Sequence, residues 1–217
     1  MSDIFDEVNE DVRRDQYIRL WKAYGKYGIA ILVAIVVGTA SGVGFHEYSQ
    51  SKKHTVSDRY EAAVELLQSG NEDEALAAFS DMRANLDGSY QVLAVLREAA
   101  IMSSAGNREG AVAAYERIVS GDVSAPPLLR DLAALRAAML LLDSAPRQEV
   151  EIRLAPLAQD DSPLRYSARE LQGLLALRYG EAETAREILS AITHDGNAPP
   201  ALRARAAALV AASGGAS

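Results

Sequence analysis

The apolar and polar positions divide the chain into two unlike parts. Residues 27–45, with the sequence YGIAILVAIVVGTASGVGF, contain no charged side chain, whereas Arg, Asp and Glu are frequent elsewhere. A helix of this length is about 28 Å long, close to the roughly 30 Å hydrocarbon core of a membrane. The pattern therefore predicts a single transmembrane helix over residues 27–45, followed by a polar domain.

The flanks of this stretch favour a retained span over two alternatives. Trp21 and Tyr48 lie at its two ends, where aromatic rings favour the headgroup layer. A buried core helix is usually shorter and has a polar edge. A cleavable signal peptide, cut near residues 38–40, would have an unusually long and acidic leader. We therefore expect the helix to stay attached.

Basic residues near the span predict its orientation. Basic residues concentrate on the cytoplasmic side of membrane helices, and more of them precede this span than follow it. We expect a cytoplasmic segment over 1–26, a juxtamembrane linker or helix extension over 46–57, and a periplasmic domain over 58–213 of a Gram-negative inner-membrane protein. The basic residues before the span are Arg13, Arg14, Arg19, Lys22 and Lys26, and those after it are Lys52, Lys53 and Arg59.

One face of the predicted span consists of small residues. Ala30, Ala34, Gly38 and Gly42 recur every four positions. Two glycines at this spacing allow helix backbones to approach closely in lipid. This face predicts self-association or packing against a membrane partner, although Gly and Ala are also common in membrane helices in general.

The polar domain is built from sequence repeats. The segments GNEDEALAAF, GNREGAVAAY and GEAETAREIL begin at Gly70, Gly106 and Gly180, so the intervals are 36 residues and twice 37 residues. A weaker copy, APRQEVEIRL, begins at Ala145. A second series of helix starts has the same period, which indicates a repeated unit of two helices. These starts are Ser89, Pro126, Pro163 and Pro199.

We therefore predict an all-α solenoid of about four helical hairpins and a capping helix, because a single hairpin cannot bury its own apolar face. The capping helix is expected over about 198–212. The predicted pairs are 55–69 with 71–85, 89–105 with 107–120, 126–143 with 147–159, and 163–179 with 181–193.

Three positions in each repeat are expected to carry the packing. A glycine permits the left-handed conformation that ends the first helix, and a small residue five positions later lets helices approach closely. A larger apolar residue four positions further on fills the space between hairpins. These residues are Gly70, Ala75 and Phe79, then Gly106, Ala111 and Tyr115, and finally Gly180, Ala185 and Leu189.

Composition argues against several classes of function. The formal net charge is −8, which disfavours a nucleic-acid groove. Without cysteine, the chain has no disulfide, thiolate nucleophile or Cys-ligated zinc. The sequence has no HExxH, GxGxxG, GxxxxGK[ST] or GxSxG pattern, and its three histidines have no carboxylate at metal-ligand spacing. We expect no enzyme, no cofactor and no metal.

The pattern G-N-x-x-E-A-x-x-x-[FY] resembles the tetratricopeptide repeat (TPR) in degenerate form. Small residues lie where the first helices pack, at Ala63, Ala99, Ala138 and Gly173, but the usual early Trp and closing Pro are missing. The layout of leader, single span and repeat domain is similar to the membrane-anchored TPR family that contains the ancillary subunit of the SecYEG translocon (YfgM-like proteins). The TPR domain of that family is related to that of the periplasmic cell-division coordinator.

This resemblance implies an adaptor or chaperone for newly exported proteins that works beside the SecYEG translocon and periplasmic chaperones. The alternatives are a scaffold for a division or envelope-assembly complex, and a soluble periplasmic protein if the N-terminal segment is cleaved. The row of first helices is the expected partner-binding surface, although some of its residues can equally belong to the core. The candidates by repeat alignment are Tyr60, Val64, Leu67, Leu93, Leu96 and Ala100.

Overall fold

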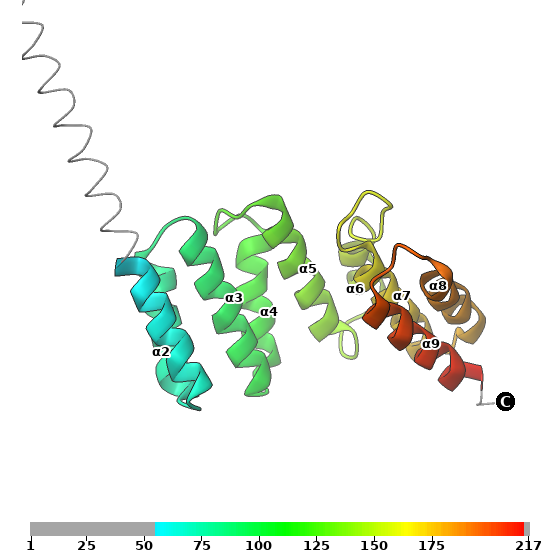
Figure 1. Ribbon diagram of the computed structural model, residues 1–217, viewed down its shortest axis with the longest axis horizontal. Helices are drawn as coiled ribbons and strands as arrows, with labels where there is room; N and C mark the ends of the chain where they lie inside the picture. Colours follow the sequence, from blue (N-terminus) through cyan, green and yellow to red (C-terminus); the bar gives the residue numbers. More distant parts are fainter. Residues whose placement is uncertain (1–54, 215–217) are drawn as a thin grey trace, which may run out of the picture. The chain divides into compact units, whose positions relative to one another are not determined.

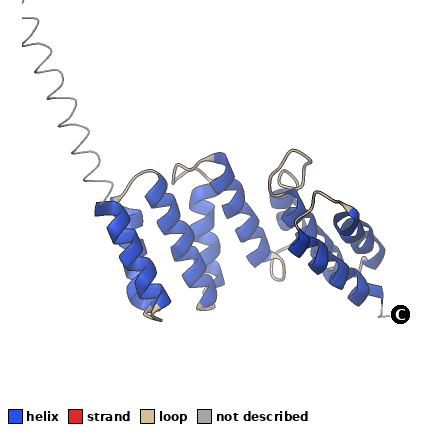
Figure 2. Cartoon of the chain, in the orientation of Figure 1, coloured by secondary structure: helices blue, strands red, loops and turns tan. Residues whose placement is uncertain are grey.

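The computed structural model describes residues 55–214, and all regular secondary structure in this range is helical (Figures 1 and 2). The prediction of an all-α fold is therefore confirmed for these residues, which form four hairpins and a last helix. A helix over 55–68 comes first. It is followed by α2 (Glu72–Asn85), α3 (Ser89–Ser104), α4 (Arg108–Val119), α5 (Pro127–Leu141), α6 (Arg147–Leu154), α7 (Arg165–Arg178), α8 (Ala182–His194) and α9 (Pro200–Gly214).

The predicted span over 27–45 lies outside the described residues, as does its small-residue face of Ala30, Ala34, Gly38 and Gly42. Within residues 55–214, no helix combines the length and the apolar character needed to cross a membrane.

The helix boundaries agree with the sequence prediction to within two residues, with one exception. The helix expected over 147–159 ends at Leu154. Pro156 follows closely, and a proline has no N–H to donate to the preceding turn. The resulting α6 has eight residues and is the shortest of the described helices.

Three of the hairpin turns share one hydrogen-bond pattern. Gly70, Gly106 and Gly180 adopt positive φ angles of 84°, 80° and 76°. In each turn, the N–H of the residue after the glycine donates to the carbonyl five residues earlier, as in the Schellman motif. This pattern ends the first helix and satisfies carbonyls that the helix leaves free. The donor–acceptor pairs are Asn71–Leu66, Asn107–Met102 and Glu181–Ala176.

The turn of the third hairpin has no glycine and relies on a side chain from the next repeat. Arg178, at the end of α7, donates from Nη1 to the carbonyl of Ala145 at 2.9 Å and also to the carbonyl of Leu142. Both carbonyls belong to the turn between α5 and α6. An arginine one repeat later therefore satisfies carbonyl groups in the turn that lacks glycine.

Ion pairs also connect α6 to the second helices of both neighbouring hairpins. Arg153 donates from Nε and Nη2 to Glu116 of α4, at 3.1 and 3.0 Å. Arg147 forms a two-bond fork to the carboxylate of Glu181, which precedes α8. This hydrogen bonding lowers the pKa of Glu181. The shortest helix thus gains charged contacts in addition to its apolar ones.

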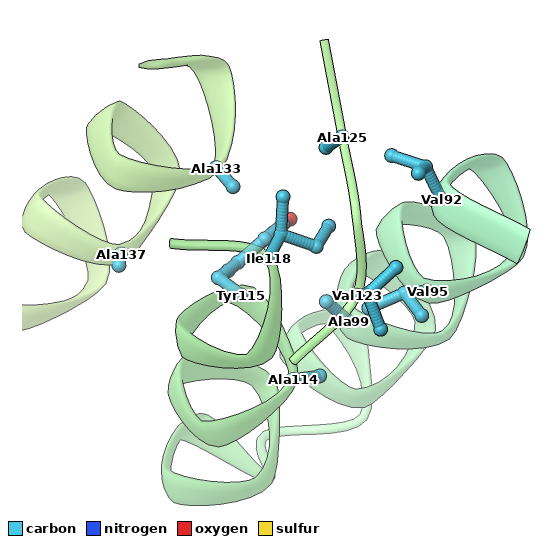
Figure 3. Packing of buried hydrophobic residues seen from close by; sticks show 10 residues of the cluster. All are labelled: Val92, Val95, Ala99, Ala114, Tyr115, Ile118, Val123, Ala125, Ala133 and Ala137. Atoms are coloured by element: carbon cyan, nitrogen blue, oxygen red, sulfur yellow. The ribbon is translucent and has the colours of Figure 1, made fainter. Parts of the chain in front are cut away.

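The core is a series of clusters, each shared by neighbouring hairpins. In the cluster of Figure 3, Val95 of α3 and Ile118 of α4 lie with Ala133 of α5. A second cluster joins α5, α6 and α7, and another joins α7, α8 and α9. Stacking therefore supplies the core that one hairpin lacks. The predicted packing residues Ala75, Phe79, Ala111, Tyr115, Ala185 and Leu189 are all buried.

The two helices of the fourth hairpin approach closely at Gly173. A Cβ atom placed on Gly173 of α7 would lie 2.7 Å from Cγ of Leu189 in α8. Leu189 is fully buried, so its side chain has no free space to move into. The absence of a side chain at position 173 is therefore what admits leucine at position 189.

Gly173→Ala should destabilise the domain by about 1 kcal/mol, because overpacking costs about 1–3 kcal/mol and exceeds the gain in helix propensity of about 1 kcal/mol. Urea unfolding measures this change. The control is the same substitution in a Leu189→Ala background, where the clash is absent and the alanine should be neutral or stabilising. An equal loss in both backgrounds would contradict the packing argument.

Arg178→Met should destabilise the domain by about 1–3 kcal/mol, since it leaves two carbonyls of the α5–α6 turn without their donor. Faster amide hydrogen exchange over residues 142–147 should accompany the loss. Arg117→Met is the matched control, because Arg117 is exposed on α4 and its side chain pairs with nothing in the described part of the chain. That control should change stability by less than about 0.5 kcal/mol.

Candidate functional site

One side of α5 is apolar but incompletely covered. Leu132, Leu135, Met139 and Leu142 recur at helical spacing along it. Of these only Leu135 is buried, and Met139 is 43% exposed. In a helix of a soluble protein, an apolar stripe of this kind usually faces the core. Its partial exposure here therefore marks a surface that is available to a binding partner.

The helices α7 and α9 provide the opposite wall, and together with α5 they enclose a groove of about 860 Å³. The lining residues come from these three helices and their ends, so they belong to the row of first helices and the last helix. None comes from α4, α6 or α8. They are Leu132, Leu135, Arg136, Met139, Leu142, Asp143, Leu164, Ser167, Glu170, Leu171, Leu174, Arg205, Ala208 and Leu209.

The groove follows from the way the third hairpin packs. The helices α5 and α7 touch directly over only a small part of their length, and much of their connection runs through the short α6. Their cluster with α6 is centred on the fully buried Val150 and Leu154. The solvent side of α5 and α7 is left open between them, and α9 closes one side of it.

A buried carboxylate and an arginine hold α9 beside the groove. Glu170 of α7 is only 7% exposed. It accepts two hydrogen bonds from Arg205 of α9, from Nε at 2.8 Å and from Nη2 at 2.6 Å. These bonds raise the pKa of Arg205. The two charges satisfy one another, because a fork of this kind matches the geometry of a carboxylate.

Two other charged residues of the groove have no partner. Arg136 and Asp143 form no hydrogen bond or ion pair by their side chains within residues 55–214, and both are exposed. Arg136 does influence the nearby phenol of Tyr115: burial raises the pKa of that phenol, and the positive charge of Arg136 opposes the rise. The groove therefore offers one free positive and one free negative group beside its apolar lining.

The loop before α9 is fixed by a second carboxylate. Asp195 accepts hydrogen bonds from Tyr166 Oη of α7 at 2.7 Å and from the N–H of Asn197 at 2.8 Å. The bond from Tyr166 is the main cause of a lowered pKa for Asp195. The guanidinium of Arg165 lies over the Tyr166 ring, 4.3 Å from its centroid. These contacts link α7 to the chain that carries α9.

Sequence reasoning missed two glutamates that are buried in the described range, Glu98 and Glu170. They lie two repeat periods apart and are each paired with an arginine, Glu98 with Arg83 of α2 at 2.8 Å. The signal was present as a recurring Arg-Glu dipeptide at 97–98 and 169–170, within otherwise apolar helix faces. Whether such a glutamate is buried and paired depends on the helix that packs against it, and the sequence spacing did not identify that helix.

The predicted partner-binding residues lie at the other end of the row of first helices and do not line the groove. The ring of Tyr60 lies 5.6 Å from that of Phe79 and 5.8 Å from that of Tyr90. Leu96 packs against the core, while Ala100 is exposed. Val64, Leu67 and Leu93 are half-buried. Within the described residues, no group of acidic or histidine side chains is arranged to hold a metal ion.

Lowering the pH below the ordinary aspartate pKa near 4 should progressively remove the stabilisation due to Asp195. A carboxylate whose pKa is lowered on folding stabilises the fold above its ordinary pKa near 4, and that stability is lost as the pH falls toward the lowered value. Asp195→Asn should therefore be less stable than wild type at pH 7, with a difference that shrinks in acid. Urea unfolding at several pH values measures it. Asp161→Asn, at an exposed residue whose side chain has no partner in the described range, should show no such convergence.

Comparison with known proteins connects the repeat domain to a family. A family model described as a tetratricopeptide repeat-like domain matches residues 19–209. No curated protein and no solved structure matches the chain. The match covers most of the sequence, and the structure shows the expected stacked hairpins. The chain therefore belongs to the tetratricopeptide repeat-like domain family, whose architecture indicates binding to protein partners.

Proposed function

We propose that this protein is a membrane-anchored adaptor or chaperone that binds newly exported proteins beside the translocon. The observation that carries the proposal is the open apolar groove between α5, α7 and α9. A lining of leucine and methionine suits side chains of varied shape, and methionine in particular adapts to different partners. Binding without catalysis is the activity that such a lining supports.

The location in this proposal derives from the sequence. The uncharged residues 27–45 are long enough for a span, and the basic residues before them favour a cytoplasmic N-terminus. The groove-bearing domain then lies in the periplasm and is held close to the membrane where exported chains emerge. The face formed by Ala30, Ala34, Gly38 and Gly42 would contact a translocon subunit or a second copy.

Photocrosslinking from the groove tests this function. A photoreactive amino acid at Met139 of the full chain should form adducts with translocon subunits and with newly exported proteins in cells. Ile152 is the matched control position, because it is 65% exposed on α6 and does not line the groove. Adducts should be several-fold fewer from Ile152, since only the groove is expected to hold clients.

The periplasmic location of the domain is tested separately in the same cells. Added trypsin should degrade the domain in spheroplasts but not in intact cells, and the intact mass should include residues 1–45. Adducts with division proteins alone would favour a scaffold. A domain that resists trypsin until the spheroplasts are lysed would contradict the proposed periplasmic location.

A further inference from the structure

We infer that the groove is built to hold about two turns of an amphipathic helix that carries an acidic residue near its start and a basic residue near its end. The inference rests on the proposed binding function and names the form and charge pattern of the bound segment. Its basis is the size of the groove, its apolar lining and its two unpaired charges.

The size of the groove fits a short helical segment. An α-helix with its side chains is a cylinder about 10 Å wide that rises about 5.4 Å per turn, which is on the order of 400 Å³ per turn. The groove volume of about 860 Å³ therefore corresponds to about two turns. Two turns present one apolar stripe, which is what a helix needs in order to bind in a groove.

The apolar lining runs along the full length of such a segment. Leu132, Leu135, Met139 and Leu142 form a stripe on α5, and Leu171 and Leu174 of α7 face it from the other wall. A stripe with this spacing accepts leucine-sized residues at helical intervals of three and four. The lining therefore selects a segment with an apolar face.

Two charged groups of the lining are unpaired within the described residues. Arg136 lies on α5, and Asp143 follows seven residues later, in the turn after α5 ends at Leu141. Glu170 and Arg205 already neutralise each other, so the unmet charges of the lining are Arg136 and Asp143.

A bound helix that runs parallel to α5 satisfies both groups. Its acidic residue would face Arg136 and its basic residue would face Asp143. An acid near the N-terminus and a base near the C-terminus also stabilise the bound helix through its own dipole. The charge pattern that the groove requires is thus one that favours helix formation in the partner.

A pair of labelled peptides tests the inference on the full chain, reconstituted in phospholipid nanodiscs. Both are alanine-based helices with leucines on one face. One has glutamate before the leucines and lysine after them, and the other has glutamine at both positions. Fluorescence anisotropy should show about fivefold tighter binding of the first peptide, since two exposed ion pairs together contribute about 1 kcal/mol to the binding free energy.

Charge removal in the protein provides the decisive comparison. Arg136→Gln combined with Asp143→Asn should abolish the preference between the two peptides. Arg117→Gln, on an exposed part of α4 away from the groove, should leave the preference unchanged. Arg136→Gln alone should reduce the preference about twofold, and it serves if the double variant fails to give a native melting transition.

Several results would overturn the inference. Equal affinity for the two peptides on wild type would exclude the charge pattern, and equal binding of a proline-interrupted version would exclude the helical form. Binding of a fatty acid with no peptide binding would assign the groove to lipid. If crosslinks from Met139 persist in cells while these peptides fail, only this inference is lost. If the peptides bind but the adducts are absent, the proposed function fails instead.

Discussion

The domain depends on the close approach of neighbouring helices at positions that hold alanine or glycine. Where Gly173 faces Leu189, a single added methyl group would overlap the leucine side chain. Ala75, Ala111 and Ala185 are fully buried at corresponding positions in three repeats. Each contact joins elements that are adjacent in the stack. The stabilising contacts are therefore distributed along the series of hairpins rather than concentrated in one central core.

The third hairpin departs from the repeat, and the groove lies beside it. Its turn lacks glycine and depends on Arg178 from the next repeat, and its second helix is cut short before Pro156. Guanidinium–carboxylate contacts of Arg147 and Arg153 connect that short helix to both neighbours. In this hairpin α6 packs less extensively against α5 and α7 than the corresponding helices of the neighbouring hairpins do, and the apolar side of α5 is exposed.

Charge plays two different roles around the groove. The carboxylates of Glu170 and Asp195 are satisfied by donors from other elements, so they fix the position of α9 and the loop before it. Such buried or shared charges are structural, because removing one partner would leave the other unsatisfied. The free groups of Arg136 and Asp143 have no such structural role in the described range. They are available to pair with charges of a bound segment, and exposed charges of this kind contribute to the specificity and register of recognition.

The sequence by itself determined the repeat period, the helices and most of their ends, because helical periodicity, glycine and proline act on the local backbone. The glycines at the turns and the small and large residues of the repeat lie where packing requires them, since the same local pattern recurs. The early end of α6, the pairing of Glu170 with Arg205 and the groove itself were decided only by the tertiary structure. Each of these depends on which side chains of distant segments meet, and residue spacing along one helix does not specify that. The partner-binding residues near Tyr60 stay a prediction from repeat alignment, whereas the groove between α5, α7 and α9 emerged only from the tertiary structure.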